Sequence, residues 1–162
     1  MAVERNDQAT EGSTQTACVI VLEENPAASD LKSLSDGLAE FNRQHAGDDG
    51  HRRLAFFLRN PDGAVVGGIY GITFWGWLSV ELLWVEEHLR GLGYGKRLLA
   101  AAEQEAVRRG CSHAFLDTFD FQAPSFYTRR GYEIFGKLAN LPPGHVRYYL
   151  TKQLQRTSET DA

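Results

Sequence analysis

The sequence predicts an α/β fold with a mixed central sheet of about seven strands. Three observations support this prediction. Short β-rich runs alternate with stretches of helical periodicity along the chain. Residues 82–99 combine an apolar run, a glycine-rich bend and a helical stretch. The strand expected before this bend is apolar on both faces, as in the centre of a sheet. A helical crossover makes the flanking strands parallel, so we expect an antiparallel first half and a parallel pair at strands four and five.

The first expected elements are a strand over residues 17–22 and an amphipathic helix after Pro26. Ser29 or Asp30 can cap the helix, which is expected to end near Gly47. Its apolar stripe, at spacings of three and four, consists of Leu31, Leu34, Leu38 and Phe41.

A β-hairpin is predicted next, with strands over residues 54–59 and 64–74 joined by a turn at residues 60–63. Glycines inside the second of these strands indicate bulges or a close backbone approach. The fourth strand is expected over residues 78–85, after a turn at residues 75–77. Strict alternation places its side chains on two faces, with Leu78, Val80, Leu82 and Trp84 on one and Trp77, Ser79, Glu81, Leu83 and Val85 on the other.

The second half of the chain contains two helices and three strands. The helix after the bend is expected to stop at Gly110. A fifth strand follows over residues 113–118, and Pro124 suits the first turn of a short helix that ends at Gly131. The last two strands are expected over residues 132–135 and 146–150.

Length and composition favour one globular domain. The chain has 162 residues, of which 43% are hydrophobic and 23% charged. We expect a domain over residues 16–154, a disordered lead over 1–15 and a frayed tail over 155–162. The net charge of −4 argues against a nucleic-acid partner, which normally requires a basic surface. No apolar run approaches the ~20 residues of a membrane span, so we expect a cytoplasmic protein without a membrane partner.

Neither cysteine nor histidine spacing indicates a metal site. Cys18 and Cys111 lie far apart in the sequence, and the five histidines show no ligand spacing. We therefore expect no metal, and the cysteines are interpreted as small apolar residues.

The bend itself has the features of an anion site. Gly91, Gly93 and Gly95 remove side chains where a helix begins, and the free N–H groups there favour an anion, most often phosphate. Arg90 and Lys96 add positive charge. The alternatives are a glycine-rich turn without a ligand and a dinucleotide fold, and the glycine spacing does not match that of the latter.

Two motifs resemble those of the GNAT superfamily of N-acetyltransferases. Arg90, Gly93 and Gly95 match its Arg-x-x-Gly-x-Gly acyl-CoA pyrophosphate loop. Residues 122–132 are similar to a second family segment, in which the matching residues are Ala123, Phe126, Tyr127, Gly131 and Tyr132. The family's asparagine falls on Asp120, which is a departure.

The resemblance implies a small bacterial-type member with the GNAT-like acyl-CoA N-acyltransferase fold, in which the parallel pair splays apart. It also implies acetyl-CoA as co-substrate. The residues it places against acetyl-CoA are Leu83, Trp84, Val85, Arg90, Gly91, Leu92, Gly93, Tyr94, Gly95, Lys96, Asp120, Ala123, Phe126 and Tyr127.

Two residues are candidates for proton transfer. The resemblance implies that Tyr127 returns a proton to the leaving thiolate, and a neutral phenol suits a general acid. Glu81 lies ~13 Å up-strand of Val85 and is the candidate base for the amine. The structural alternatives are a core aromatic for Tyr127 and a salt-bridged surface carboxylate for Glu81.

The acceptor is expected to be a primary amine on a small or amino-acid-like molecule, attacking the thioester directly. Trp75 and Trp77 are candidates for packing it, although a hydrophobic plug at the strand turn explains them equally well. Asp117 and His145 are further candidates. The alternatives are a protein N-terminus or lysine as acceptor, and a non-catalytic acyl-CoA sensor. Retention of Tyr127 and Glu81 favours an enzyme, and a homodimer is compatible with this reading.

Overall fold

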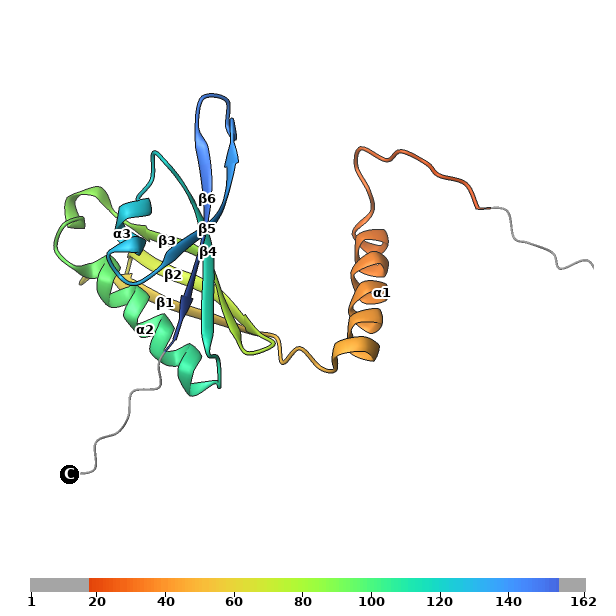
Figure 1. Ribbon diagram of the computed structural model, residues 1–162, viewed down its shortest axis with the longest axis horizontal. Coiled ribbons are helices and arrows are strands. Elements are labelled where there is room, and N and C mark those ends of the chain that lie inside the picture. Colours follow the sequence, from red (N-terminus) through yellow and green to blue (C-terminus); the bar gives the residue numbers. More distant parts are fainter. Residues whose placement is uncertain (1–17, 155–162) are drawn as a thin grey trace, which may run out of the picture. The chain divides into compact units, whose positions relative to one another are not determined.

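The computed structural model describes residues 18–154 (Figure 1). The predicted lead over 1–15 and tail over 155–162 lie outside the described residues. The chain divides after Asn42 into two units, and each is described by itself. The single domain expected over residues 16–154 therefore stays a prediction.

The first unit contains the start of helix α1 (Ala28–Ala46). Helix α1 includes the predicted apolar stripe. It begins at Ala28, so Ser29 and Asp30, the expected caps, lie inside its first turn. The strand expected over residues 17–22 is wrong over its described part, because residues 18–22 form no strand. A β-rich run becomes a strand only when a neighbouring strand accepts and donates its backbone hydrogen bonds, which residue preference alone does not ensure.

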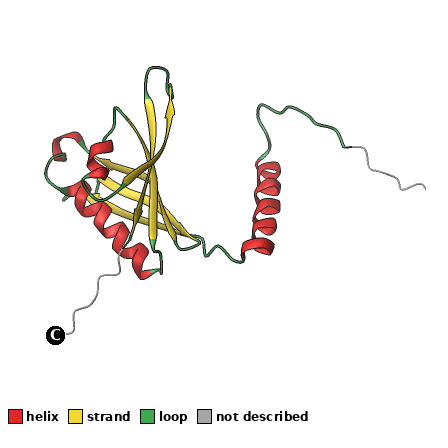
Figure 2. Ribbon diagram, viewed as in Figure 1, coloured by secondary structure: helices red, strands yellow, loops and turns green. Residues whose placement is uncertain are grey.

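The second unit is built on a six-stranded sheet (Figure 2). The strands lie in the order β1-β2-β3-β4-β6-β5. Only the β3–β4 pair is parallel, so the predicted α/β class, antiparallel first half and parallel pair are confirmed. Because the first expected strand is missing, the predicted strands four and five are β3 and β4. The strand bounds are β1 (Arg52–Arg59), β2 (Val65–Phe74), β3 (Trp77–Val85), β4 (His113–Phe119), β5 (Glu133–Ala139) and β6 (Val146–Gln153).

Strands β3 and β4 separate before they end. Their pairing runs from Trp77 opposite His113 to Val80 opposite Leu116. Beyond Val80, β3 continues to Val85 with only β2 as its neighbour. The edge of β3 that faces the gap therefore has backbone groups without a partner strand, as the expected splay requires.

A β-bulge lies in β3 at the point where the splay begins. Tyr70 pairs with Leu82 and Gly71 with Val80, so Glu81 is the extra residue. A Cβ atom at Gly71 would lie 2.5 Å from the Ser79 carbonyl oxygen. The bulge and close approach predicted from the strand glycines are both observed.

The bulge inverts the side-chain alternation of β3, which makes the predicted faces wrong in its second half. Leu78 and Val80 are buried in the core before the bulge. After it, Leu83 and Val85 pack against the core. Leu82 and Trp84, expected on the same face as Leu78, are instead 66% and 50% exposed. One extra residue is enough to turn every later side chain to the other face.

Helix α2 (Tyr94–Arg108) covers one face of the sheet, where the core lies (Figure 1). Its buried stripe is the predicted set Leu98, Leu99, Ala102 and Ala106. The helix gives way at Gly110, whose φ of 88° is in the left-handed region, as the sequence predicts. Two shorter helical segments flank the site: the 3₁₀ turn η1 (Glu87–Leu89) and helix α3 (Pro124–Thr128).

Candidate active site

The bend between β3 and α2 presents a row of unpaired backbone donors. Gly91 and Gly93 have φ angles of 78° and 85°, which favour glycine. Gly93 is the N-cap of α2 and no side chain caps the helix. The first intrahelical bond is donated by the Arg97 N–H to the Gly93 carbonyl, at 3.1 Å. Among residues 47–154, no acceptor bonds the N–H groups of residues 91–96, so these donors are available to an anion.

The Arg90 side chain is hydrogen-bonded to the end of β3. Its Nε donates a hydrogen bond to the Val85 carbonyl, at 2.9 Å. One lone pair of that carbonyl is therefore already used, although the carbonyl was expected to be offered to a ligand. The other nitrogens of the Arg90 guanidinium remain for the anion.

A cavity of about 890 Å³ runs from the bend along β3 to the end of β4 and to α3. Its cationic wall is made by Arg90, Lys96, Arg129 and Arg130, and Glu81 and Asp117 contribute carboxylates. Of the other residues predicted for the site, those that line it are Leu83, Trp84, Val85, Gly91, Gly93, Tyr94, Gly95, Ala123, Phe126 and Tyr127. Five predicted residues do not line it: Leu92, Asp120, Trp75, Trp77 and His145.

Tyr127 lies on α3 and is 9% exposed. Its ring packs edge-on against Phe126 and Tyr132, at centroid distances of 5.0 and 5.8 Å. Burial first, and then the negative charge of Asp117, raise the pKa of Tyr127 to about 12. The phenol therefore holds its proton at neutral pH, as a general acid must.

Glu81 occupies the bulge where β3 and β4 diverge. Its carboxylate accepts a hydrogen bond from the Ser79 hydroxyl. Among residues 47–154, no cationic side chain forms an ion pair with it. Glu81 is thus an exposed carboxylate that lines the same cavity as Tyr127.

The sequence of the whole chain was compared with known families and proteins. The model of the acetyltransferase (GNAT) family matches residues 20–132, which is more than half of the chain. The chain belongs to the GNAT family of acetyltransferases. The expected GNAT fold is confirmed, because a crystal structure of an acetyltransferase from Bacillus cereus superposes with a TM-score of 0.76 and 29% identity. That match covers 83% of this chain and 98% of the other.

Two curated relatives are also acetyltransferases. An acetyltransferase from Agrobacterium fabrum is 40% identical over 75% of this chain and 89% of its own length. A blasticidin-S acetyltransferase from Streptomyces morookaense is 44% identical over 57% of this chain and 68% of its own length. Like the family match, they identify the GNAT chain as an acetyltransferase enzyme.

The residues of this GNAT chain that were predicted to contact the acceptor amine lie in different surroundings. Asp117 lines the cavity and receives a hydrogen bond from the Nε of Arg147, at 2.6 Å. His145 Nδ1 lies 3.0 Å from Asp120 Oδ1, and the His145 ring contacts Phe121, which lines the cavity. Trp77 stacks on His113 at a centroid distance of 4.5 Å, at the amino end of β3. Trp75 lies in the preceding turn, two residues further from Glu81 in the chain than Trp77.

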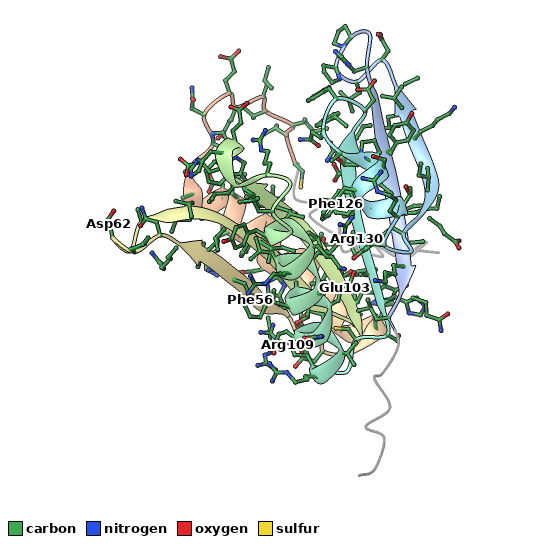
Figure 3. All side chains as sticks on the ribbon, turned by 90° about the vertical axis from the view of Figure 1, so that its left-hand side faces the viewer. Phe56, Asp62, Glu103, Arg109, Phe126 and Arg130 are labelled. Atoms are coloured by element: carbon green, nitrogen blue, oxygen red, sulfur yellow. The ribbon has the colours of Figure 1, made fainter. Side chains whose placement is uncertain are left out.

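A polar cluster next to α3 was not predicted from the sequence. It consists of Arg130, Glu103 and Lys152, of which Arg130 and Glu103 are labelled in Figure 3. The Arg130 guanidinium carbon lies 3.7 Å from the centroid of the Phe126 ring, and Arg130 also donates to the Phe126 carbonyl. Glu103 pairs with Lys152 at 2.7 Å. Burial, together with Arg129, lowers the pKa of Arg130, and Glu103 opposes this shift. The available signal was the pair of consecutive arginines, Arg129 and Arg130, directly after α3.

Phe119 and Phe121 were also missed, and both line the cavity. The signal was available. Asp117 and Phe119 are two residues apart on one strand, so they share a face, and Phe121 continues this spacing beyond the strand end. Among the described residues, no group of three or more potential metal ligands gathers. No described helix is long and apolar enough to cross a membrane.

Proposed function

We propose that this acetyltransferase moves the acetyl group of acetyl-CoA to a primary amine of a small molecule, which attacks the thioester directly. One observation carries the proposal. A single cavity connects the unpaired N–H groups of the bend with Glu81 and Tyr127 at the splay. It therefore offers an anion site and a proton-transfer site to the two ends of one elongated ligand.

The bend suits a diphosphate. Its unpaired donors lie at the start of α2, and no atom outside the immediate neighbours lies within 4 Å of a Cβ position at Gly91 or Gly93. Lys96 and Arg90 add positive charge. From there, the free edge of β3 up to Val85 offers backbone groups to the amides of the pantetheine arm. Acetyl-CoA, when bound, supplies an activated acyl group, so the protein needs chiefly to orient the amine and move protons.

Glu81 and Tyr127 divide the proton transfers. The Glu81 carboxylate accepts a proton from the ammonium form of the acceptor, directly or through water, which leaves a nucleophilic amine. Tyr127 keeps its phenolic proton because its pKa is raised to about 12, and it donates that proton to the departing sulfur as the C–S bond breaks. The nitrogen, once bonded to the acetyl carbon, releases its second proton to water, and water returns a proton to the Tyr127 oxygen. The two residues therefore act as base and acid in one cavity.

A small-molecule acceptor is favoured over a protein. The relative from Streptomyces morookaense is a blasticidin-S acetyltransferase and is 44% identical over the matched region. The acceptor end of the cavity is also bordered by paired side chains, Asp117 with Arg147, rather than by a run of free carboxylates.

A panel assay tests the proposal. The purified chain is incubated with acetyl-CoA and, separately, blasticidin S, small primary amines, amino acids, and peptides with a free N-terminus or lysine. Thiol release measures turnover, and mass spectrometry locates the acetyl group. We expect acetylation of at least one small amine and a large loss in Glu81→Gln. Acetylation of peptides alone would identify a protein acetyltransferase, and acetyl-CoA binding without turnover throughout would identify a sensor.

A further inference from the structure

We infer that the acceptor carries a flat unsaturated ring, which binds against an aromatic wall formed by Phe119 and Phe121. The inference rests on the proposed function and specifies the class of amine. The two rings stack at a centroid distance of 5.2 Å with an interplanar angle of 4°. Phe121 lines the cavity and is 57% exposed. A large apolar ring left open inside a cavity indicates a binding surface.

The wall is held rigidly by polar partners. The Gln122 side-chain oxygen accepts hydrogen bonds from the Phe119 N–H, at 2.9 Å, and from the Thr118 hydroxyl, at 3.0 Å. The Asp120 carboxylate accepts a bond from the Phe121 N–H, at 2.8 Å. These bonds fix the turn that carries both rings, so little conformational entropy is lost when a ligand stacks there.

Two polar side chains, Arg147 and His145, pack against the rings. The Arg147 guanidinium lies over the Phe119 ring, 5.4 Å from its centroid, and is anchored by Asp117. The His145 ring meets Phe121 edge-on at 4.9 Å and lies beside Asp120. Arg147 therefore packs against Phe119 and His145 against Phe121, while more than half of Phe121 remains accessible to solvent.

The position of the wall assigns it to the acceptor rather than to the nucleotide. Leu116 and Thr118 of β4 are buried, so Asp117 and Phe119, which alternate with them, face the opposite side of the sheet. The anion site lies at the start of α2, on the covered side. The wall thus lies across the sheet from the bend and shares its cavity with Glu81.

The charged side chains near the aromatic wall indicate which other group the ligand carries. Arg147 already neutralises Asp117, whereas Glu81 has no cationic partner among residues 47–154. The ligand that complements this surface has a planar ring for Phe121 and a separate protonated amine for Glu81. Aromatic pairing adds a preference for unsaturated rings beyond the burial of apolar area.

A matched pair of amines tests the inference. Benzylamine and cyclohexylmethylamine have similar size, both are cationic at neutral pH, and only the first has a flat ring. Their binding to the CoA-loaded protein is measured by saturation-transfer NMR, and their acetylation by thiol release. We expect wild type to favour benzylamine by about 2- to 12-fold. In Phe121→Leu the ratio should fall to about one, while KM for acetyl-CoA stays unchanged. Phe135→Leu, at another exposed phenylalanine that does not line the cavity, should retain the wild-type ratio.

The outcomes separate this inference from the proposed function. Equal binding of both amines to wild type, or an equal effect of Phe121→Leu on both, would overturn the aromatic wall even if acetylation occurs. A raised KM for acetyl-CoA in Phe121→Leu would overturn it by assigning the ring to the donor. A ring preference in binding without turnover of any amine would support the wall and count against the proposed reaction.

Discussion

Tyr127 and Glu81 show how residue environment divides acid from base in one cavity. Tyr127 is packed between two aromatic rings, so its neutral form is favoured. Glu81 is exposed to solvent at a bulge, and its side chain accepts a hydrogen bond from Ser79. The proposed roles follow from this difference in burial.

Replacing Tyr127 with Phe removes the hydroxyl and keeps the ring packing. We expect kcat to fall by roughly 10²-fold or more, since a lost general acid typically costs that much. KM for acetyl-CoA should change little, because the ring still lines the cavity. Steady-state thiol release with a fixed acceptor measures both constants. An equal loss in kcat and acetyl-CoA affinity would argue against an acid role.

The raised pKa of Tyr127 predicts how the protein responds to alkaline pH. A phenol whose folded-state pKa is above the unfolded value of about 10 contributes stability below that value. This contribution is lost as pH rises through about 12. We therefore expect tyrosinate absorbance from Tyr127 to appear late in a titration of the folded protein. The difference between wild type and Tyr127→Phe shows it, and an ordinary midpoint near 10 would contradict the assigned burial.

At the scale of elements, the bulge in β3 connects glycine placement to the position of Glu81. Gly71 allows the backbone of β2 to approach Ser79, two residues before the extra residue Glu81. The bulge turns the Glu81 carboxylate into the cavity and directs Leu83 and Val85 into the core. A regular strand would present a different set of side chains to the ligand.

Gly71→Ala should disturb this bulge. The added methyl would lie 2.5 Å from a backbone oxygen, so β2 and β3 must separate. We expect a loss of about 1–3 kcal/mol in the free energy of unfolding, typical of overpacking. Gly136→Ala is the matched control, because its Cβ would lie 3.8 Å from the nearest atom, on Tyr149. Urea unfolding compares them, and equal stabilities would show that the close approach is not required.

Helix α3 has five residues and depends on its surroundings for stability. Phe126 links it to the bend, since a Cβ at Gly95 would lie 3.5 Å from the Phe126 ring. The Arg130 guanidinium lies over the same ring, and both residues are labelled in Figure 3. The cluster therefore holds the residue that precedes Tyr127.

Arg130→Lys keeps the charge and loses the planar stack on Phe126. If Arg130 positions α3, kcat should fall several-fold while KM for acetyl-CoA stays near the wild-type value. Arg129→Lys is the matched control, because Arg129 also lines the cavity but no stack of Arg129 on Phe126 is observed. A raised KM with normal kcat in Arg130→Lys would instead assign Arg130 to binding of the coenzyme by charge.

Across the whole molecule, the features that could be predicted are those that residues close together in the sequence determine. Gly91 and Gly93 before an amphipathic helix specify a bend with left-handed backbone, and that bend is observed. The apolar stripe of α2 and its stop at Gly110 were predictable for the same reason. Both depend on neighbours in sequence.

Features that depend on distant partners were not predictable. Residues 18–22 have strand composition, but a strand also requires a neighbour with free backbone groups. The faces of β3 depend on Glu81 being left unpaired opposite β2, which alternation along one strand cannot reveal. The pairing of Asp117 with Arg147 joins residues 30 apart in the chain, so the sequence offered both residues as candidates for the pocket but could not show that they pair.

The central claim is that the N–H groups of the bend hold the diphosphate of the coenzyme. Amide NMR of the labelled chain, titrated with CoA and separately with pantetheine, which lacks the diphosphate, tests it most directly. We predict large shifts for the amides of residues 91–96 with CoA and small ones with pantetheine. Shifts of β3 amides with both ligands and no response in the bend would contradict the account.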